Sequence, residues 1–430
     1  MKKYTLPKPF FFSLLLLMSL IRPGIMVGQE EKSTEQDTSV VIPEEPLTYK
    51  NKDWNEFDFG FTTFRIGGGF IMDYVAHSQD EDGETQSELA KIVLEDQFKT
   101  RDFRVILGGK FNTKLPLAWK TAIMWDGDNE EWLVRETGLV IGLPKLNSQV
   151  FIGRTKEGFS MPKIMNGHSP WGIERQPAVD LIPIMADGIR WYVYLPKSRV
   201  FGTVAAFNDV LSHEQKFSTF SEQYLLRLGW LPFYNKEEKK LLHIAGYARY
   251  GKPENGKFKV RSRPESNASP YFIDSGEFAS DKTYSYGGEI YYTSGRWMLG
   301  TEGYTHNFKS DSSEEHTFAG ADFVISYFLT GESRPYNTTG NIYQFVPVNK
   351  PLGQGGWGAW EAVFRISNFN LNEESGSIQG GNMTRITPMI NWYVTRAVRI
   401  EFVYGYTILE RFGLTGHTHL FQGRFQYTLF

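Results

Sequence analysis

The stretch Phe64–Tyr74, FRIGGGFIMDY, alternates large apolar side chains with charged or small ones. The apolar set is Phe64, Ile66, Phe70, Met72 and Tyr74, and the opposing set is Arg65, Gly67, Gly69 and Asp73. Successive side chains of a β-strand point to opposite faces, so this strand has one apolar face and one polar face. Segments of about ten residues with this pattern are typical of a transmembrane β-barrel, whose outer face meets lipid and whose inner face meets water.

The same alternation returns along the chain. Apolar residues oppose Arg, Lys, Asp or Glu in the segments 103–111, 119–126, 360–366, 385–392 and 398–404. A soluble β-sandwich also alternates, with its apolar face in the core and its polar face in water. Alternation alone therefore leaves a barrel and a sandwich open.

The lengths of the connections favour the barrel, because outer-membrane barrels have short turns at one end and longer loops at the other. We predict an all-β fold with 16 antiparallel strands. The long links are 76–101, 157–186, 209–222, 251–282 and 368–382, and the short links are 112–116, 144–147, 195–198, 294–296 and 395–397. One link, Thr330–Gly356, is long where the alternation requires a short turn.

The chain divides into three predicted regions. Residues 1–28 have the form of a secretory signal peptide, with Lys2 and Lys3 before an apolar run. A membrane anchor is the alternative, but the run is shorter than the ~20 apolar residues that a spanning helix needs. Residues 29–56 are rich in Glu, Lys, Ser and Thr and are predicted to be a flexible periplasmic segment. Residues 57–430 form the predicted barrel domain.

Composition excludes several classes of protein. The 46 Lys and Arg residues against 49 Asp and Glu residues disfavour a nucleic-acid partner. The absence of Cys rules out disulfides, Cys-bound metals and thiol nucleophiles. The mean hydropathy of -0.36 and the lack of a second apolar run predict no membrane helix after residue 28. Aromatic residues make up 15% of the chain, which suits either interfacial girdles or an ordinary core.

Several motifs resemble a known family. They are Ser326–Asn337 (SYFLTGESRPYN), Gly358–Asn372 (GAWEAVFRISNFNLN), Gly153–Ser160 (GRTKEGFS) and the opening FRIGGGFIMDY stretch. Together they resemble the phosphate-selective porins O and P. The resemblance implies a 16-stranded barrel that is usually trimeric, with a loop folded into the lumen and basic residues along the path of anions. It also makes the long link after Thr330 expected, because the family carries that segment.

The third long connection, Glu157–Ala186, is the expected constriction. Rings of Arg and Lys suit pores for anions and phosphate, because the guanidinium group matches oxyanions and low-dielectric walls focus the field. The candidate pore-lining residues are Arg65, Arg104, Lys110, Lys120, Arg135, Arg154, Lys156, Lys163, Arg175 and Arg190. A merely solvated lumen face is the alternative for each residue alone. Acidic residues such as Asp73, Asp126, Glu289, Asp322 and Glu401 are equally compatible with an inward position.

The leading functional hypothesis is a passive outer-membrane channel of a Gram-negative bacterium that favours small inorganic anions such as phosphate. It needs no cofactor, no metal and no catalytic residue, and its expected partners are outer-membrane lipid and two further copies in a homotrimer. The alternatives are a general or sugar-type porin and an outer-membrane β-barrel hydrolase. No sequence signature of a hydrolase is present, since Gly167–Trp171 lacks the final glycine of the nucleophile elbow.

Two strings resemble nucleotide-binding motifs. Gly251–Phe258 has Phe258 where a hydroxyl residue should follow the lysine, and Gly353, Gly355 and Gly358 precede a strand rather than a helix. Both strings are therefore interpreted as turn glycines.

Overall fold

The computed structural model describes residues 54–211, 220–312 and 314–429. The predicted signal peptide and residues 29–53 of the predicted periplasmic segment lie outside the described residues. Within the described ranges the chain forms a closed antiparallel β-barrel of 16 strands, as predicted. No helix in this part of the chain is both long enough and apolar enough to cross a membrane.

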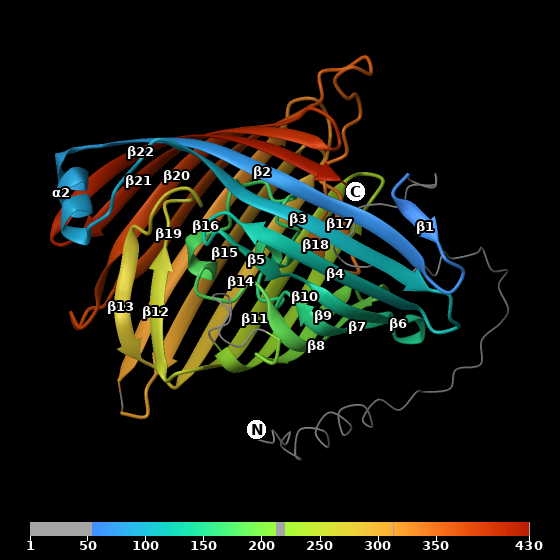
Figure 1. Cartoon of the computed structure of the whole chain (residues 1–430), viewed down its shortest axis with the longest axis horizontal. Coiled ribbons are helices and arrows are strands. Elements are labelled where there is room, and N and C mark those ends of the chain that lie inside the picture. Colours follow the sequence, from blue (N-terminus) through green and yellow to red (C-terminus); the bar gives the residue numbers. More distant parts are fainter. Residues whose placement is uncertain (1–53, 212–219, 313, 430) are drawn as a thin grey trace. The chain divides into compact units, whose positions relative to one another are not determined.

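The 16 strands follow one another around the barrel in chain order (Figure 1). They are β2 (Thr63–Gln79), β3 (Gln97–Phe111), β4 (Leu117–Asp126), β6 (Thr137–Leu143), β7 (Ser148–Thr155), β8 (Ala186–Leu195), β9 (Val200–Asn208), β10 (Phe220–Asn235), β11 (Lys240–Pro253), β14 (Lys282–Ser294), β15 (Trp297–Lys309), β16 (Glu315–Phe328), β19 (Ala359–Asn372), β20 (Gln379–Tyr393), β21 (Val398–Arg411) and β22 (Leu414–Leu429). The barrel closes between β2 and β22, from the pair Gly68 and Leu429 to the pair Gln79 and Thr418.

Two short strands extend the same sheet. β1 (Glu56–Asp58) pairs with the first residues of β2. β5 (Glu131–Val134) pairs with β4 beyond the point where β6 does, so β5 and β6 together occupy one position in the barrel. These additions leave the predicted strand count unchanged.

The apolar faces of the strands point outward. On β2 the side chains of Met72 and Tyr74 are exposed, whereas Asp73 between them is 1% exposed. On β10 the large residues Leu226 and Leu228 are exposed, whereas Arg227 is fully buried. A water-soluble fold would show the opposite arrangement, because its apolar face would be packed in the core. The alternation in the sequence therefore belongs to a barrel with an apolar exterior and a polar lumen.

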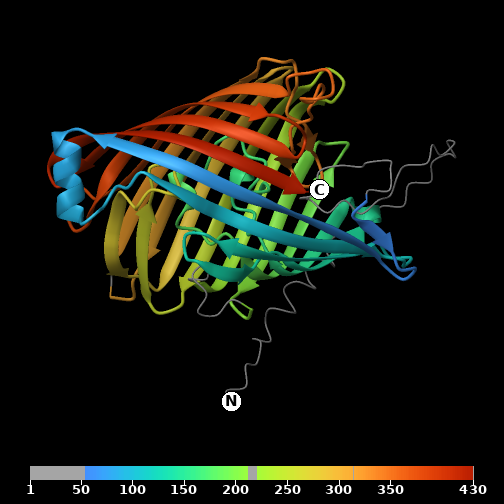
Figure 2. The same ribbon diagram turned by 45° about the horizontal axis from the view of Figure 1, so that its top comes forward.

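The two ends of the barrel differ. One end carries α2 (Glu81–Ala90) and the hairpin of β12 (Lys257–Ser262) and β13 (Ile273–Ala279), and the other carries β1 and the C-terminus (Figures 1 and 2). The links at the second end are short, apart from residues 329–358, and include the turn η1 (Pro144–Leu146). We refer to the α2 end as the external end and to the other as the periplasmic end, following the predicted alternation of loops and turns.

Three segments lie across the lumen and its mouths. The inner loop, residues 156–185, contains α3 (Met161–Ile164) and η2 (Pro177–Val179). The external hairpin, residues 254–281, contains β12 and β13. The periplasmic insert, residues 329–358, contains β17 (Tyr336–Asn337) and β18 (Ile342–Tyr343) and contacts α3. The long link that broke the alternation is thus a segment that folds back against the inner loop.

Candidate functional site

The inner loop is bonded to strands on all sides of the barrel, which places it inside the lumen. Side chains of β8, β11, β21 and β22 each bond to a different part of the loop. The bonds run from Arg190 Nη1 to the Lys156 carbonyl (2.7 Å), from Arg249 Nε to Glu157 (2.8 Å), from Arg399 Nη1 to the Pro170 carbonyl (2.9 Å) and from Gln426 Nε2 to the His168 carbonyl (2.9 Å). A loop with partners on so many strands is a fixed constriction rather than a free lid.

Glycines in the opening stretch of the sequence allow this close approach. The imidazole of His168 on the inner loop bonds to Asp102 of β3 (3.2 Å) and to Thr428 of β22 (3.0 Å). A Cβ atom built on Gly69 would lie 2.1 Å from Cε1 of His168, which is far inside van der Waals contact. The glycine in this strand is therefore where the inner loop rests against the barrel wall.

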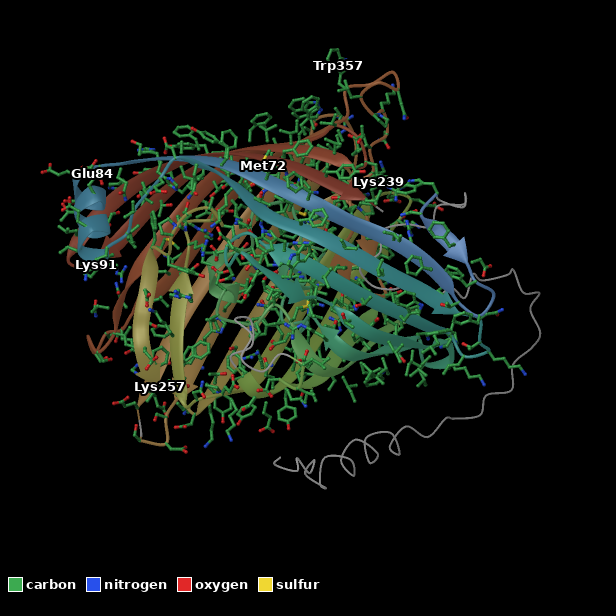
Figure 3. The ribbon with its side chains drawn as sticks, viewed as in Figure 1. Met72, Glu84, Lys91, Lys239, Lys257 and Trp357 are labelled. Carbon is green, nitrogen blue, oxygen red and sulfur yellow. The ribbon has the colours of Figure 1, made fainter. Side chains whose placement is uncertain are left out.

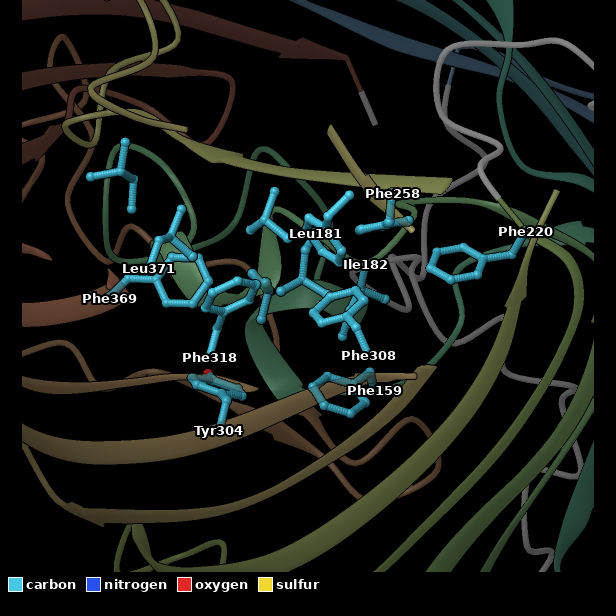
Figure 4. Close-up of a cluster of buried hydrophobic side chains, with 14 of the residues drawn as sticks. Phe159, Leu181, Ile182, Phe220, Phe258, Tyr304, Phe308, Phe318, Phe369 and Leu371 are labelled. Atoms are coloured by element: carbon cyan, nitrogen blue, oxygen red, sulfur yellow. The ribbon is translucent and has the colours of Figure 1, made fainter. Parts of the chain in front are cut away.

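Apolar contacts complete the attachment of the inner loop. Phe159, Leu181 and Ile182 pack against a cluster of buried aromatic residues on the wall (Figure 4). The wall members include Phe308 of β15, Phe318 of β16 and Phe369 of β19, and Phe258 of the external hairpin joins the same cluster. This cluster holds the inner loop and the external hairpin together on one side of the lumen.

A cavity of about 400 Å³ lies between the inner loop and the external hairpin. We call it the vestibule. Its basic lining residues are Arg101, Arg104, Arg135, Lys163, Arg175, Lys259, Arg261, Arg263 and Arg385, and its acidic ones are Asp126, Asp128, Glu174, Asp180 and Glu265. Nine cations against five carboxylates give this space a positive excess, although the whole chain has a net charge of -3. Low-dielectric walls strengthen the field of such an excess.

Several of these cations are paired with carboxylates, two of which lie outside the cavity lining: Arg104 pairs with Asp102 (2.7 Å) and Lys259 with Asp274 (2.9 Å). Arg101 bonds to Glu174 (2.6 Å), and Arg263 bonds to Asp128 (2.7 Å). The buried Nε–H groups of Arg104 and Arg385 have no hydrogen-bond partner in the described part of the chain. An unpaired donor that is shut away from water is costly in free energy, and these two atoms are buried rather than open to a solute in the vestibule.

The lumen wall has a basic sector and an acidic sector. Arginines Arg365, Arg385, Arg399 and Arg424 lie on the neighbouring strands β19, β20, β21 and β22, all nearly fully buried. Three carboxylates, Glu289, Glu302 and Asp322, are direct register partners across β14, β15 and β16. Two of them hold the inner loop, because Glu289 accepts from the Met161 amide (2.8 Å) and Glu302 from Gln176 (2.8 Å). These three carboxylates therefore face the inner loop, and two of them hold the loop in place by hydrogen bonds.

The ten predicted pore-lining residues divide into three groups. Arg104, Arg135, Lys163 and Arg175 line the vestibule. Four others are buried and bonded within the protein. Lys120 bonds to Glu136 and Arg154 to Asp187. Lys156 bonds to carbonyls of the inner loop, and Arg190 bonds to the Lys156 carbonyl. The half-buried Arg65 and the exposed Lys110 lie near the periplasmic end of β2 and β3, away from the vestibule.

Two of the predicted basic residues, Lys163 and Arg175, also donate hydrogen bonds within the inner loop. Lys163 Nζ donates to the carbonyls of Val179 (3.0 Å) and Ile182, and Arg175 Nε donates to the Pro162 carbonyl (3.0 Å). Lys163 lies on α3 rather than on a spanning strand, and burial lowers the pKa of its ammonium group to about 7. Its charge therefore varies in the neutral range of pH.

Sequence reasoning missed five basic residues of the vestibule. Arg101 and Arg385 lie on strands, and Arg385 has the polar parity that pointed to other candidates. Lys259, Arg261 and Arg263 lie on the external hairpin, where both Arg261 and Arg263 stack on Tyr271 with guanidinium carbons 4.1 and 4.3 Å from the ring centre. No alternation in the sequence distinguishes these loop residues from solvated surface charges.

Comparison with known proteins places the chain among bacterial outer-membrane channels. The family model described as phosphate-selective porin O and P matches residues 187–429. An uncharacterised protein of Caulobacter vibrioides is 29% identical over 148 residues, which is 34% of this chain and 29% of that protein. The fold is similar to OmpT of Vibrio cholerae (TM-score 0.54, 9% identity, 87% of this chain and 99% of that one). It is also similar to OprB of Pseudomonas putida (TM-score 0.53, 10% identity, 85% of this chain and 94% of that one).

Proposed function

The chain belongs to the phosphate-selective porin O and P family, and on that premise we propose that it is a passive outer-membrane channel that favours small anions, phosphate included. The outer-membrane porin channel follows from the family and the barrel. The preference for anions is our inference from the charges of the vestibule. A signal peptide at residues 1–28 would deliver the chain across the inner membrane.

The observation that carries the proposal is the excess of basic residues around the vestibule. A solute that passes between the external hairpin and the inner loop crosses this cavity. The guanidinium group of Arg261, which stacks on Tyr271 in the cavity lining, can bond to an oxyanion there. A cation entering the same space meets nine positive groups against five negative ones. The balance favours anions in the vestibule.

A homotrimer is also proposed, with its interface on the side of β7, β8 and β9. These strands have 8, 10 and 9 residues, whereas β10 has 16 and β20 has 15. A tilted spanning strand needs about 9–11 residues, so the short side is only just long enough to face lipid. Its exposed apolar residues are branched aliphatic ones, including Ile152, Ile189 and Val204. A β-branched side chain has few rotamers, so it loses little conformational entropy when it packs against a second copy.

Measurement of the reversal potential in a planar bilayer under a salt gradient tests the anion preference. The purified full-length protein is expected to give the sign of an anion-permeable pore in potassium chloride, and phosphate is expected to compete with chloride for the current. A cation-selective potential would overturn the anion proposal. Equal swelling rates of proteoliposomes in neutral sugars and in anions of similar size would favour a general or sugar-type porin instead.

A further inference from the structure

A glycine-rich loop at the end of the periplasmic insert projects from the barrel wall. It spans residues 350–358, KPLGQGGWG, and Trp357 lies at its far edge (Figures 1 and 3). The side chain of Trp357 is 77% exposed, more than any other large apolar side chain in the described residues. Contact of an exposed indole with water is unfavourable, and an apolar environment around this side chain would be more stable.

The loop is built to hold this shape. The Gly358 amide donates to the Lys350 carbonyl (2.9 Å) and closes the base, and the Leu352 amide donates to the Val394 carbonyl (2.9 Å) and ties the loop to the neighbouring turn. Gly353, Gly355 and Gly358 have φ values of 82°, 80° and 77°, which other residues adopt only with strain. The glycines of the G-x-G-x-x-G string therefore allow the backbone conformation that places Trp357 at the edge of the loop.

Hydrogen bonds fix the height of Trp357 along the barrel. Its carbonyl accepts from the indole nitrogens of Trp360 (3.1 Å) and Trp392 (2.7 Å). These two rings are stacked with centres 5.0 Å apart, and they face outward at the periplasmic ends of β19 and β20. Trp297 and Tyr327 form a similar outward pair on β15 and β16, 4.5 Å apart. Trp357 therefore continues the periplasmic aromatic girdle away from the wall.

The place of the loop on the barrel points to lipid as its partner. The loop lies between β16 and β19, which have 14 residues each, and is separated from the short strands β7, β8 and β9 by five longer strands, β10, β11, β14, β15 and β16. Trp is enriched at the boundary between headgroups and acyl chains, because its ring is apolar and its N–H is polar. Leu352, which is 42% exposed, adds apolar surface to the same loop.

We propose that the glycine-rich loop inserts Trp357 into the headgroup and acyl boundary of the periplasmic leaflet beside the barrel. The periplasmic insert would then be held from two sides. Within the lumen its Arg334 donates to the Ser169 carbonyl of the inner loop (2.9 Å), and Tyr343 lies 6.0 Å from Trp171 between ring centres. At the wall the lipid would hold its other end. This inference depends on the membrane barrel and on the proposed position of the trimer interface, and not on the anion preference.

Site-directed spin labelling tests the proposal, because the chain has no Cys. The Trp357→Cys variant, labelled and reconstituted in phospholipid vesicles, is compared with Phe364→Cys on the outward face of β19 and with Glu237→Cys on an exposed periplasmic turn. We expect collisions with oxygen close to those at residue 364 and collisions with a water-soluble nickel chelate well below those at residue 237. Nickel access equal to that at residue 237 would overturn the proposal. Shielding from both reagents would also overturn it, since protein would then cover the site.

Quenching by brominated phospholipids provides a second measurement on the native side chain. The Trp357→Phe variant should lose part of the emission that the brominated lipids quench, at unchanged secondary structure. An identical quenched fraction in wild type and variant would contradict the proposal. Both Trp357 variants should keep the wild-type reversal potential, because the residue lies outside the pore, so the outcome is independent of the proposed anion preference.

Discussion

Arg385 offers the sharpest test of the electrostatic reasoning. It lies on β20, is 1% exposed and lines the vestibule. Its Nη1 donates to the Arg263 carbonyl (3.0 Å) and its Nη2 donates to Ser367 (3.0 Å), while its Nε–H has no partner in the described chain. The Arg385→Gln variant removes one of nine vestibule cations and keeps a side-chain donor at the same position. We expect it to lower the anion preference without closing the pore.

The size of the effect follows from the distance between the guanidinium group and a solute in the cavity. A unit charge about 6 Å away contributes roughly 0.7 kcal/mol in water and roughly 2.8 kcal/mol at an effective dielectric constant near 20. The lining of the vestibule is rich in ionised groups, so we take a value between these limits, about 1 kcal/mol. Because about 1.4 kcal/mol is a tenfold change, chloride should lose about five-fold and potassium gain about five-fold, so their permeability ratio should fall roughly 25-fold.

Reversal potentials in a planar bilayer under a salt gradient measure this ratio. The matched control is Lys257→Gln, which removes the same charge from the external hairpin at a position that is 64% exposed and does not line the vestibule. Counterions screen an exposed charge over about 10 Å at 0.1 M salt, so the control should stay near wild type. Equal shifts in the two variants, or an unchanged ratio in Arg385→Gln, would refute the assignment of the vestibule as the selective element.

Three further predictions concern the inner loop and the assembly. Raising the pH from about 6 to about 8 should lower the anion preference in reversal-potential measurements. Over this range Lys163, with its pKa lowered to about 7 by burial, loses its positive charge, and Asp180, with its pKa raised to about 6 by burial, completes its ionisation. Lys163→Met should therefore weaken the dependence, and the double variant with Asp180→Asn should abolish it. Glu157→Gln leaves the buried Arg249 without its charged partner at a cost of about 3–5 kcal/mol, so single-channel recordings should show a larger and noisier conductance. Ile189→Trp on β8 should reduce the trimer fraction in light scattering, whereas Ile290→Trp on the longer strand β14 should not, because lipid accommodates a bulky ring and a packed interface does not.

The alternation of side chains predicted the barrel because it reports a local property of each strand. Met72 and Asp73 are adjacent in sequence and lie on opposite sides of the wall, so parity alone tells lipid-facing residues from lumen-facing ones. The same logic would have included Arg385 and Arg424 among the candidates. Parity says nothing of depth along the barrel, however, and Lys110 with the correct parity lies exposed at the periplasmic end.

The alternation of side chains could not predict the positions of the loops. Their positions depend on contacts between residues far apart in sequence, such as Arg365 Nη1 with the Glu174 carbonyl (2.9 Å) and His77 with Ser269 (2.7 Å). No periodic pattern marks such partners. The anomalous length of the link after Thr330 was the one available sign of the periplasmic insert, and it indicated an extra segment without showing that the segment folds against the inner loop.

The distribution of paired charges explains why composition is a poor guide to selectivity in this chain. Most lumen arginines are held by carboxylates, as in the pairs of Arg227 with Glu289, Arg249 with Glu157, Arg334 with Glu361 and Arg424 with Asp73. The two charges of such a buried pair largely cancel, so the pair exerts little net field on a solute. Breaking the pair is costly in free energy, and this cost holds the inner loop and the periplasmic insert in place. The field that a solute meets is the sum over all the charges near it, and nine cations against five carboxylates line the vestibule. A protein with a negative net charge can therefore have a basic vestibule when many of its carboxylates form the ion pairs that hold the inner loop in place.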